Sequence, residues 1–262
     1  MKIFKLLLII SFLSISTPAF AWGPLTHIYL GNEVYYMGSL LPAALFEIIR
    51  RYRKDFLYGN LVADIIFGKK YLPEDKNSHS WEVAFDLLNA AETKQQKAFV
   101  YGYMSHLAAD TVAHNSYIVN KKNIRHTVLE IKADSIINKK YWFQAMTFDK
   151  KIQMRNDLFL ENFLERFVFS FKTNKRILKS TIFFSILYRE KINDFIDKNL
   201  ITTLPPRKTI ESLQEKSLDR IVDLFQNWER SNVVKLNPCG NGYKNRFFAR
   251  ESEPDLFRIY KK

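Results

Sequence analysis

A regularly spaced set of polar residues inside an apolar segment constrains this chain more than any other feature of its sequence. His106, Asp110 and His114 recur every four residues, and the positions between them are mostly apolar. In an α-helix this spacing places the three side chains along one stripe. Polar groups in so apolar a helix need partners once the helix is buried, and a bound metal ion would satisfy them together.

A second pair repeats the four-residue spacing farther along the chain. His126 and Glu130 lie in segment 124–138, which is expected to be helical. Two such helices side by side would present ligands to each other across a bundle, an arrangement known for metal sites in helical folds. For any single pair, an ion pair on the helix surface is the commoner explanation. All five histidines lie between residues 27 and 126, which adds weak support for a metal site.

The rest of the sequence also favours helices. Apolar residues recur at helical spacing over long segments, and hairpin signals are missing except at Asn241-Gly242. Ser80 and Thr93 are expected to cap two helices. We therefore expect an all-α, single-domain helical bundle. The expected helices cover residues 40–56, 80–91, 93–112, 124–138, 150–172, 176–199 and 209–231.

Residues 1–21 are typical of a secretory signal peptide. A positively charged start precedes an apolar run over residues 6–13, and Ala19 and Ala21 supply small residues at the cleavage positions. The alternative is a signal anchor that is never removed, but the run is shorter than the roughly 20 residues that span a bilayer. Cleavage would make Trp22 the first residue, and its free α-amine, with a pKa of about 8, can bind a metal once deprotonated. We expect an exported protein, periplasmic or secreted.

The net charge indicates which kinds of partner the protein can bind, and the cysteine content limits how its fold can be stabilised. The formal net charge of +13 favours anionic partners, and phospholipid headgroups and nucleic acids both qualify. A general solubility role for this charge is the alternative. Cys239 is the only cysteine, so stability must come from core packing, bound metal or both. We expect residues 22–237 to form the folded domain and residues 238–262 to form a polar C-terminal tail.

The candidate ligands lie in five segments that together span about residues 22–135. The segments are Trp22-Gly-Pro-Leu-Thr-His27, Gly59-Asn-Leu-Val-Ala-Asp64, His79, Gly102-Tyr-Met-Ser-His106-Leu-Ala-Ala-Asp110-Thr-Val-Ala-His114 and His126-x-x-x-Glu130. In content and order they resemble the bacterial zinc-dependent phospholipase C family. The sequence is also similar to the phospholipase domain of glycosylphosphatidylinositol-cleaving enzymes and, more distantly, to the trinuclear zinc nucleases that cut single strands.

The resemblance implies a helical fold that holds three zinc ions in a cleft. It implies one zinc on Trp22 (through the α-amine and the carbonyl oxygen) and His27, a second on Asp64, His79 and His106 with Asp110 bridging the two, and a third on His114, His126 and Glu130. Residues 140–262 match no motif of the family that we identify.

The implied activity is hydrolysis of the glycerol–phosphate ester bond of a phospholipid by metal-activated water. In this scheme water on the pair of ions bridged by Asp110 attacks the phosphorus, and the third zinc stabilises the leaving alkoxide. Asp64 is a candidate general base or water-orienting group, or only a ligand. The spacings from Trp22 to His27 and from Asp110 to His114 depart from the phospholipase pattern. Two alternatives therefore stay open: a zinc nuclease or other phosphodiesterase, and a non-catalytic protein that zinc stabilises.

Overall fold

The computed structural model describes residues 22–65, 78–114, 123–163, 176, 179, 182–183 and 205–239. Within these ranges it contains helices and no strand, so the prediction of an all-α fold is confirmed. The elements, in chain order, are α2 (Pro24–Tyr36), η1 (Gly38–Leu40), α3 (Ala43–Arg51), α4 (Arg53–Val62), η2 (Ala63–Ile65), α5 (Trp81–Ala90), α6 (Lys94–Val112), α7 (Asn123–Ser135), α8 (Lys139–Met146), α9 (Lys150–Phe163), α12 (Arg207–Asn227), η7 (Trp228–Arg230) and η8 (Asn232–Lys235).

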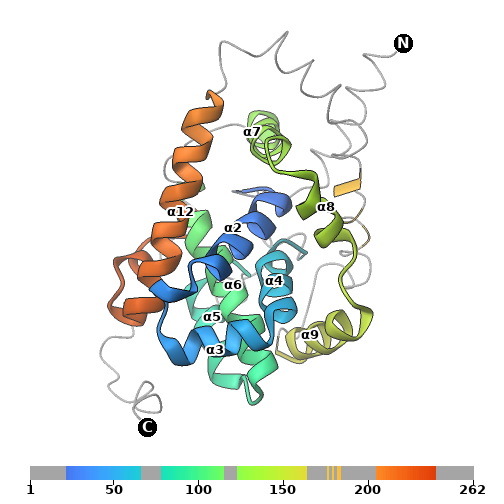
Figure 1. The fold of residues 1–262 in the computed structure, drawn as a ribbon, viewed down its shortest axis with the longest axis vertical. Coiled ribbons are helices and arrows are strands. Elements are labelled where there is room, and N and C mark those ends of the chain that lie inside the picture. Colours follow the sequence, from blue (N-terminus) through green and yellow to red (C-terminus); the bar gives the residue numbers. More distant parts are fainter. Residues whose placement is uncertain are drawn as a thin grey trace.

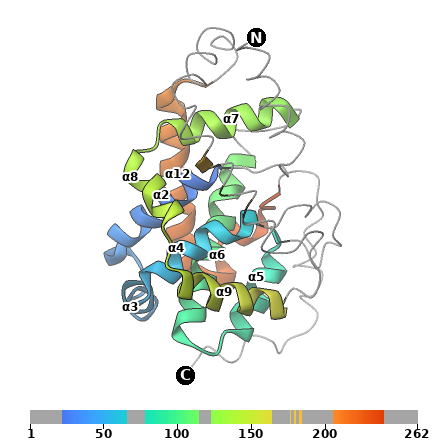
Figure 2. The same ribbon diagram turned by 90° about the vertical axis from the view of Figure 1, so that its right-hand side faces the viewer.

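Helix α6 is the central element of the fold (Figure 1). Every residue from Ala98 to Val112 is buried. A helix buried on its whole circumference needs neighbours on all sides, and α2, α3, α4, α5, α9 and α12 all contact α6. In the view turned by 90°, α7 crosses the end of the bundle above α2 (Figure 2). The stripe predicted from the sequence therefore lies at the centre of the molecule.

Two glycines let α4 and α6 pack with their backbones in contact. A Cβ atom on Gly59 would lie 1.9 Å from the carbonyl oxygen of Phe99, and one on Gly102 would lie 1.9 Å from the carbonyl oxygen of Phe56. No side chain fits at such distances, and glycine is the residue that permits this approach. The contact brings the C-terminal end of α4 beside the middle of α6, where predicted ligands of both segments lie.

The predicted caps are confirmed by their hydrogen bonds. The Ser80 hydroxyl accepts from the backbone N–H of Glu82 at 3.1 Å, at the start of α5. Thr93 and Gln96 bond each other's backbone N–H groups at the start of α6 and so form a capping box. Ser80 follows His79 directly, so the start of α5 also fixes the position of that histidine.

Other helix predictions need correction. The single helix expected over 40–56 is wrong, because Tyr52 (φ −121°, ψ 42°) separates α3 from α4, although the apolar spacing continues across the break. Helices α2 and α8 were not expected. Proline at the first position of α2 is a favoured start.

Several predictions concern residues outside the described ranges. These are the signal peptide at 1–21, the end of the helix expected over 150–172, nearly all of the one expected over 176–199, and the tail beyond residue 239. Among the helices that are described, none combines the length and the apolar character that crossing a bilayer requires.

Replacing Gly102 by alanine should destabilise the fold strongly. The new methyl group would meet a backbone carbonyl that cannot move aside alone, so we expect the free energy of unfolding to fall by about 3 kcal/mol. Gly31→Ala is a matched control, because the three atoms nearest to its Cβ would be side-chain atoms of Asn60 and Leu57, at 3.0–3.1 Å. Chemical denaturation followed by circular dichroism measures both variants. An equally small loss of unfolding free energy in both variants would show that the packing of α4 against α6 does not depend on their backbone contact.

Candidate metal centre

The structure brings predicted ligands from four separate parts of the chain into one cluster. Those parts are the start of α2, the short helix η2, the turn before α5 and the C-terminal half of α6. All of these residues are buried, with at most 2% of their surface exposed. The cluster consists of Trp22, His27, Asp64, His79, His106 and Asp110.

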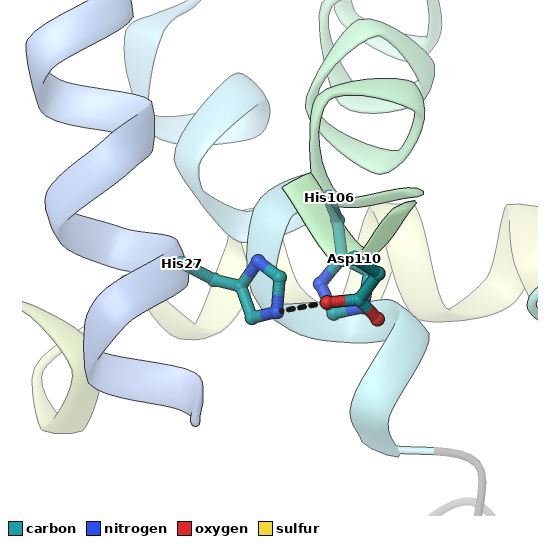
Figure 3. Close-up of side chains that lie close together, drawn as sticks. All are labelled: His27, His106 and Asp110. Carbon is teal, nitrogen blue, oxygen red and sulfur yellow. Dashed lines mark ion pairs between the residues drawn. The ribbon is translucent and has the colours of Figure 1, made fainter. Parts of the chain in front are cut away.

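Asp110 lies at the centre of the cluster. Its Oδ1 accepts a hydrogen bond from the backbone N–H of Trp22 at 3.4 Å and lies 3.1 Å from Nε2 of His27. Its Oδ2 lies 3.1 Å from Nε2 of His79 and 3.3 Å from Nε2 of His106. Figure 3 shows His27 reaching from α2 toward Asp110, which lies beside His106 on α6. The two oxygens thus face different sets of donors, as a bridging carboxylate would, although the bridging role stays a prediction.

Asp64 faces the same imidazoles from η2. Its Oδ1 lies 3.5 Å from Nε2 of His79 and 3.6 Å from Nε2 of His106, and its Oδ2 lies 4.0 Å from Nε2 of His27. Two sets of three residues have ligand atoms within 4.8 Å of one another: His27, His106 and Asp110, and Asp64, His79 and His106. Each set is a candidate site for one ion.

Hydrogen bonds on the outer side of the cluster determine which ring nitrogen faces inward. Nδ1 of His106 lies 2.8 Å from the carbonyl oxygen of Asn60, which can only accept, so Nδ1 carries the hydrogen. Ser78 donates its single hydroxyl hydrogen to the carbonyl of Ala63 at 3.3 Å and therefore accepts from Nδ1 of His79, also at 3.3 Å. Such outer partners orient histidine ligands in metal sites. In the neutral rings both Nε2 atoms then point inward with a lone pair.

This arrangement requires a cation. Nε2 of His79 and Nε2 of His106 lie only 3.1 Å apart, and two lone pairs at that distance repel unless a proton or a metal ion lies between them. Within the described residues, neither ring nitrogen of His27 nor Oδ2 of Asp110 makes a hydrogen bond, although all three atoms are buried. Buried polar atoms left in this state cost free energy. The residues present therefore fit a bound metal.

The pKa values respond to the same geometry. Burial and the neighbouring His106 lower the pKa of His27. Burial also acts to lower the pKa of His106, but the carboxylates of Asp64 and Asp110 outweigh it and raise that pKa. Although burial opposes the effect, His106 and His27 hold the pKa of Asp110 well below its usual range. When no metal is bound, the two carboxylates therefore favour the protonated form of His106.

The remaining predicted ligands are the ones expected for a third ion. His114 lies just beyond the end of α6 and is half-buried, and Glu130 is buried on α7. The side chain of His126 lies outside what the structure describes. The third ion therefore stays a prediction.

The residues that hold the start of α2 in place were missed by the sequence analysis. The carboxylate of Asp134 accepts hydrogen bonds from Leu25 and Thr26, and burial raises its pKa to about 7 although these bonds act to lower it. Ser217 on α12 accepts from the indole N–H of Trp22 at 3.1 Å. The only available signal was that Asp134 continues the four-residue spacing after Glu130, and nothing in the sequence indicated Ser217.

Residues 236–239, at the C-terminal end of the described chain, also contact the surroundings of the metal centre. Trp81 donates its indole N–H to the carbonyl of Leu236 at 2.8 Å, and Sγ of Cys239 lies 3.6 Å from the carbonyl oxygen of His79. Cys239 therefore packs against the turn that carries this histidine. The division of the chain at residue 238 stays a prediction.

Comparison with known proteins confirms the family resemblance and extends it beyond residue 135, where the motifs identified in the sequence end. A family model described as "Zinc dependent phospholipase C" matches residues 26–177, more than half of the chain. An uncharacterised protein of Archaeoglobus fulgidus is 28% identical over 125 residues, which cover 44% of this chain and 32% of that protein. The chain thus spans about a third of the length of this relative. No solved structure matches the chain.

Removing the metal should destabilise the protein more at pH 8 than at pH 6. The pKa of His106 is raised in the folded, metal-free protein, so its stabilising contribution is complete below about pH 6.5 and is lost as the pH rises through the folded pKa. A metal also displaces fewer protons at high pH and binds more tightly. We expect the stability difference between metal-loaded and chelator-treated protein to grow by about 1 kcal/mol or more between the two pH values. Calorimetry measures it, and a difference that is equal or larger at pH 6 would contradict the proton–metal exchange.

Proposed function

The chain belongs to the zinc-dependent phospholipase C family, and on this basis we propose that it hydrolyses the glycerol–phosphate ester bond of a phospholipid. The observation that carries the proposal is the buried cluster in which three imidazoles lie beside the carboxylates of Asp64 and Asp110. These residues stand at motif positions of the family and lie close enough to share ions. A zinc phosphodiesterase needs such a set of nitrogen and oxygen ligands.

The proposed ligand set follows the family motif and uses three ions. Zinc supplies Lewis acidity and a water molecule with a pKa near 7, which provides a nucleophile at neutral pH. We assign one ion to Trp22 and His27, a second to Asp64, His79 and His106, with Asp110 shared between them, and a third to His114, His126 and Glu130.

The carboxylates have different tasks in this proposal. The oxygens of Asp110 face His27 on one side and His79 and His106 on the other, so one side chain keeps both groups of ligands at a constant separation. Asp64 reaches the same imidazoles at 3.5–4.0 Å from η2. From there it can orient the attacking water and accept its proton. A role as a ligand only is the alternative.

The N-terminal segment supports processing before Trp22. The side chain of Trp22 is fully buried, and its backbone nitrogen lies 3.4 Å from Oδ1 of Asp110. Cleavage of the preceding bond would convert this nitrogen from an amide, which has no usable lone pair, to an amine beside a carboxylate. We therefore propose export with removal of residues 1–21. The net charge of +13 suits an anionic substrate, such as a phospholipid surface.

A substrate panel tests the proposed reaction. Purified exported protein is incubated with phosphatidylcholine, phosphatidylethanolamine, phosphatidylinositol and single-stranded DNA, with and without a chelator. We expect diacylglycerol and a phosphorylated headgroup from at least one lipid, and no product after chelation. Cleavage of DNA alone would replace the lipase proposal with a nuclease. Zinc-loaded protein that cleaves nothing would favour the non-catalytic alternative.

In the same assay, Asp110→Asn should lower the rate by at least about a hundredfold, since one neutral amide cannot replace a carboxylate shared by two ions. Asp55→Asn is the control. Asp55 is also buried, but it pairs with Arg155 and Asn156 on the α9 side of α4. This variant should lose stability and keep its rate at a temperature where it is folded. A wild-type rate for Asp110→Asn would show that Asp110 is not a shared ligand.

An extension directly before Trp22 should remove one zinc ion and most of the activity, because the nitrogen would remain an amide. Trp22→Phe with correct processing keeps the amine and loses only the hydrogen bond to Ser217 and some packing, so it should lose about 1 kcal/mol of stability and little zinc. Elemental analysis and intact mass compare these two proteins with the processed wild type. Equal zinc content in the extended protein would show that the N-terminus is not a ligand.

A further inference from the structure

The start of α2 receives its helix cap from another helix. Its first N–H groups have no partner within α2, and the residue at the N-cap, Gly23, has no side chain to offer. Asp134 of α7 fills this place. Its Oδ2 accepts from the N–H of Leu25 at 3.2 Å, and its Oδ1 accepts from the N–H of Thr26 at 2.9 Å and from the Thr26 hydroxyl at 2.8 Å. These two N–H groups are the ones that an ordinary N-cap side chain would bond.

Gly23 provides the space for this carboxylate. Its backbone (φ −73°, ψ 163°) is one that any residue adopts, so conformation does not require glycine here. A Cβ atom at Gly23, however, would lie 2.4 Å from both Cγ and Oδ2 of Asp134 and 2.6 Å from its Oδ1. The three nearest atoms all belong to this one carboxyl group. The nearest obstacle to a side chain at this position is therefore the cap itself.

The capped segment begins and ends with predicted ligands. Trp22 precedes the capped residues and His27 follows them, and Glu130 lies one helical turn before Asp134 on α7. A second anchor lies on α12, where Ser217 accepts from the indole of Trp22 and donates to the carbonyl of Leu213 at 2.9 Å. The carboxylate of Asp134 thus ties one ligand-bearing helix to the segment that carries two other ligands.

We propose that Asp134 is a positioning residue that, together with the absence of a side chain at Gly23, holds segment 22–27 where its nitrogen atoms reach the metal cluster. Hydrogen bonds from α2 engage both oxygens of Asp134, so we assign this carboxylate to the cap and not to the ligand set. Without it the ion assigned to Trp22 and His27 is lost, while the site formed by Asp64, His79 and His106 remains. This inference rests on the proposed function for the identity of the ligands.

Four variants of the exported protein test the proposal: Asp134→Ala, Asp134→Asn, Gly23→Ala and the double variant Gly23→Ala/Asp134→Ala. Ser135→Ala is the control, since Ser135 is buried beside Asp134 on α7 but, among the residues that the structure describes, bonds only to the carbonyl of Lys132 in its own helix. Hydrogen exchange with mass spectrometry follows the peptide that covers residues 22–30 in metal-free protein, and elemental analysis counts zinc in loaded protein. Circular dichroism confirms that each variant is folded.

Asp134→Ala and Gly23→Ala should each speed exchange in this peptide about tenfold, as expected for a lost cap, and each should lose about one zinc ion. Asp134→Asn keeps one acceptor oxygen and the shape of the side chain, so it should fall between these variants and the wild type. It also keeps the test decisive if Asp134→Ala does not fold. The double variant should be no worse than Asp134→Ala, since removing the carboxyl group removes the obstacle to the new methyl group.

Wild-type exchange and zinc content in Asp134→Ala would overturn the proposal, and so would a similar loss in Ser135→Ala. If the double variant lost as much exchange protection and zinc as the two single variants together, the role assigned to Gly23 would be overturned. These readouts require no turnover. A protein that shows the expected exchange and zinc pattern but cleaves no phospholipid would therefore refute the proposed function and leave the role of Asp134 standing.

Discussion

The site depends first on the backbone contact between α4 and α6. Because Gly59 and Gly102 have no side chains, the two helices approach until each glycine faces a carbonyl oxygen of the other helix. At that distance the carbonyl of Asn60 reaches Nδ1 of His106 and fixes the orientation of its ring. The same approach places Asp64, just beyond α4, beside His106. A wider spacing between the helices would separate these groups, whatever residues stood at the ligand positions.

The buried charges explain why folding and metal binding should be linked. Two carboxylates and three imidazoles, all nearly inaccessible to solvent, would be costly in an apolar core without a cation. A proton on His106 can partly compensate, because the carboxylates of Asp64 and Asp110 raise the pKa of this residue. A divalent ion compensates more completely, and its binding free energy then contributes to the stability of the fold. On the outer side, Nδ1 of His106 donates to the carbonyl of Asn60 and Nδ1 of His79 donates to the hydroxyl of Ser78, and these hydrogen bonds orient the rings before any metal binds.

How much could be predicted from the sequence depends on how far apart the interacting residues lie along the chain. Helix α6 and its stripe were predictable, because the spacing of His106, Asp110 and His114 and the Thr93 cap are local signals. Asp64 and His79 came from the family motif rather than from periodicity, since η2 and the turn before α5 are too short to have a period. Asp134 and Ser217 could not be predicted. Their partners lie 108 and 195 residues away in the sequence.

The central claim is that this cluster binds zinc as a unit, and anomalous X-ray scattering from crystals of zinc-loaded, processed protein tests it most directly. Data collected on either side of the zinc absorption edge locate each ion without reference to activity. The account predicts one anomalous peak among Asp64, His79 and His106 and another beside Trp22 and His27, with Asp110 between them. Full occupancy of surface sites with no peak inside this cluster would contradict it.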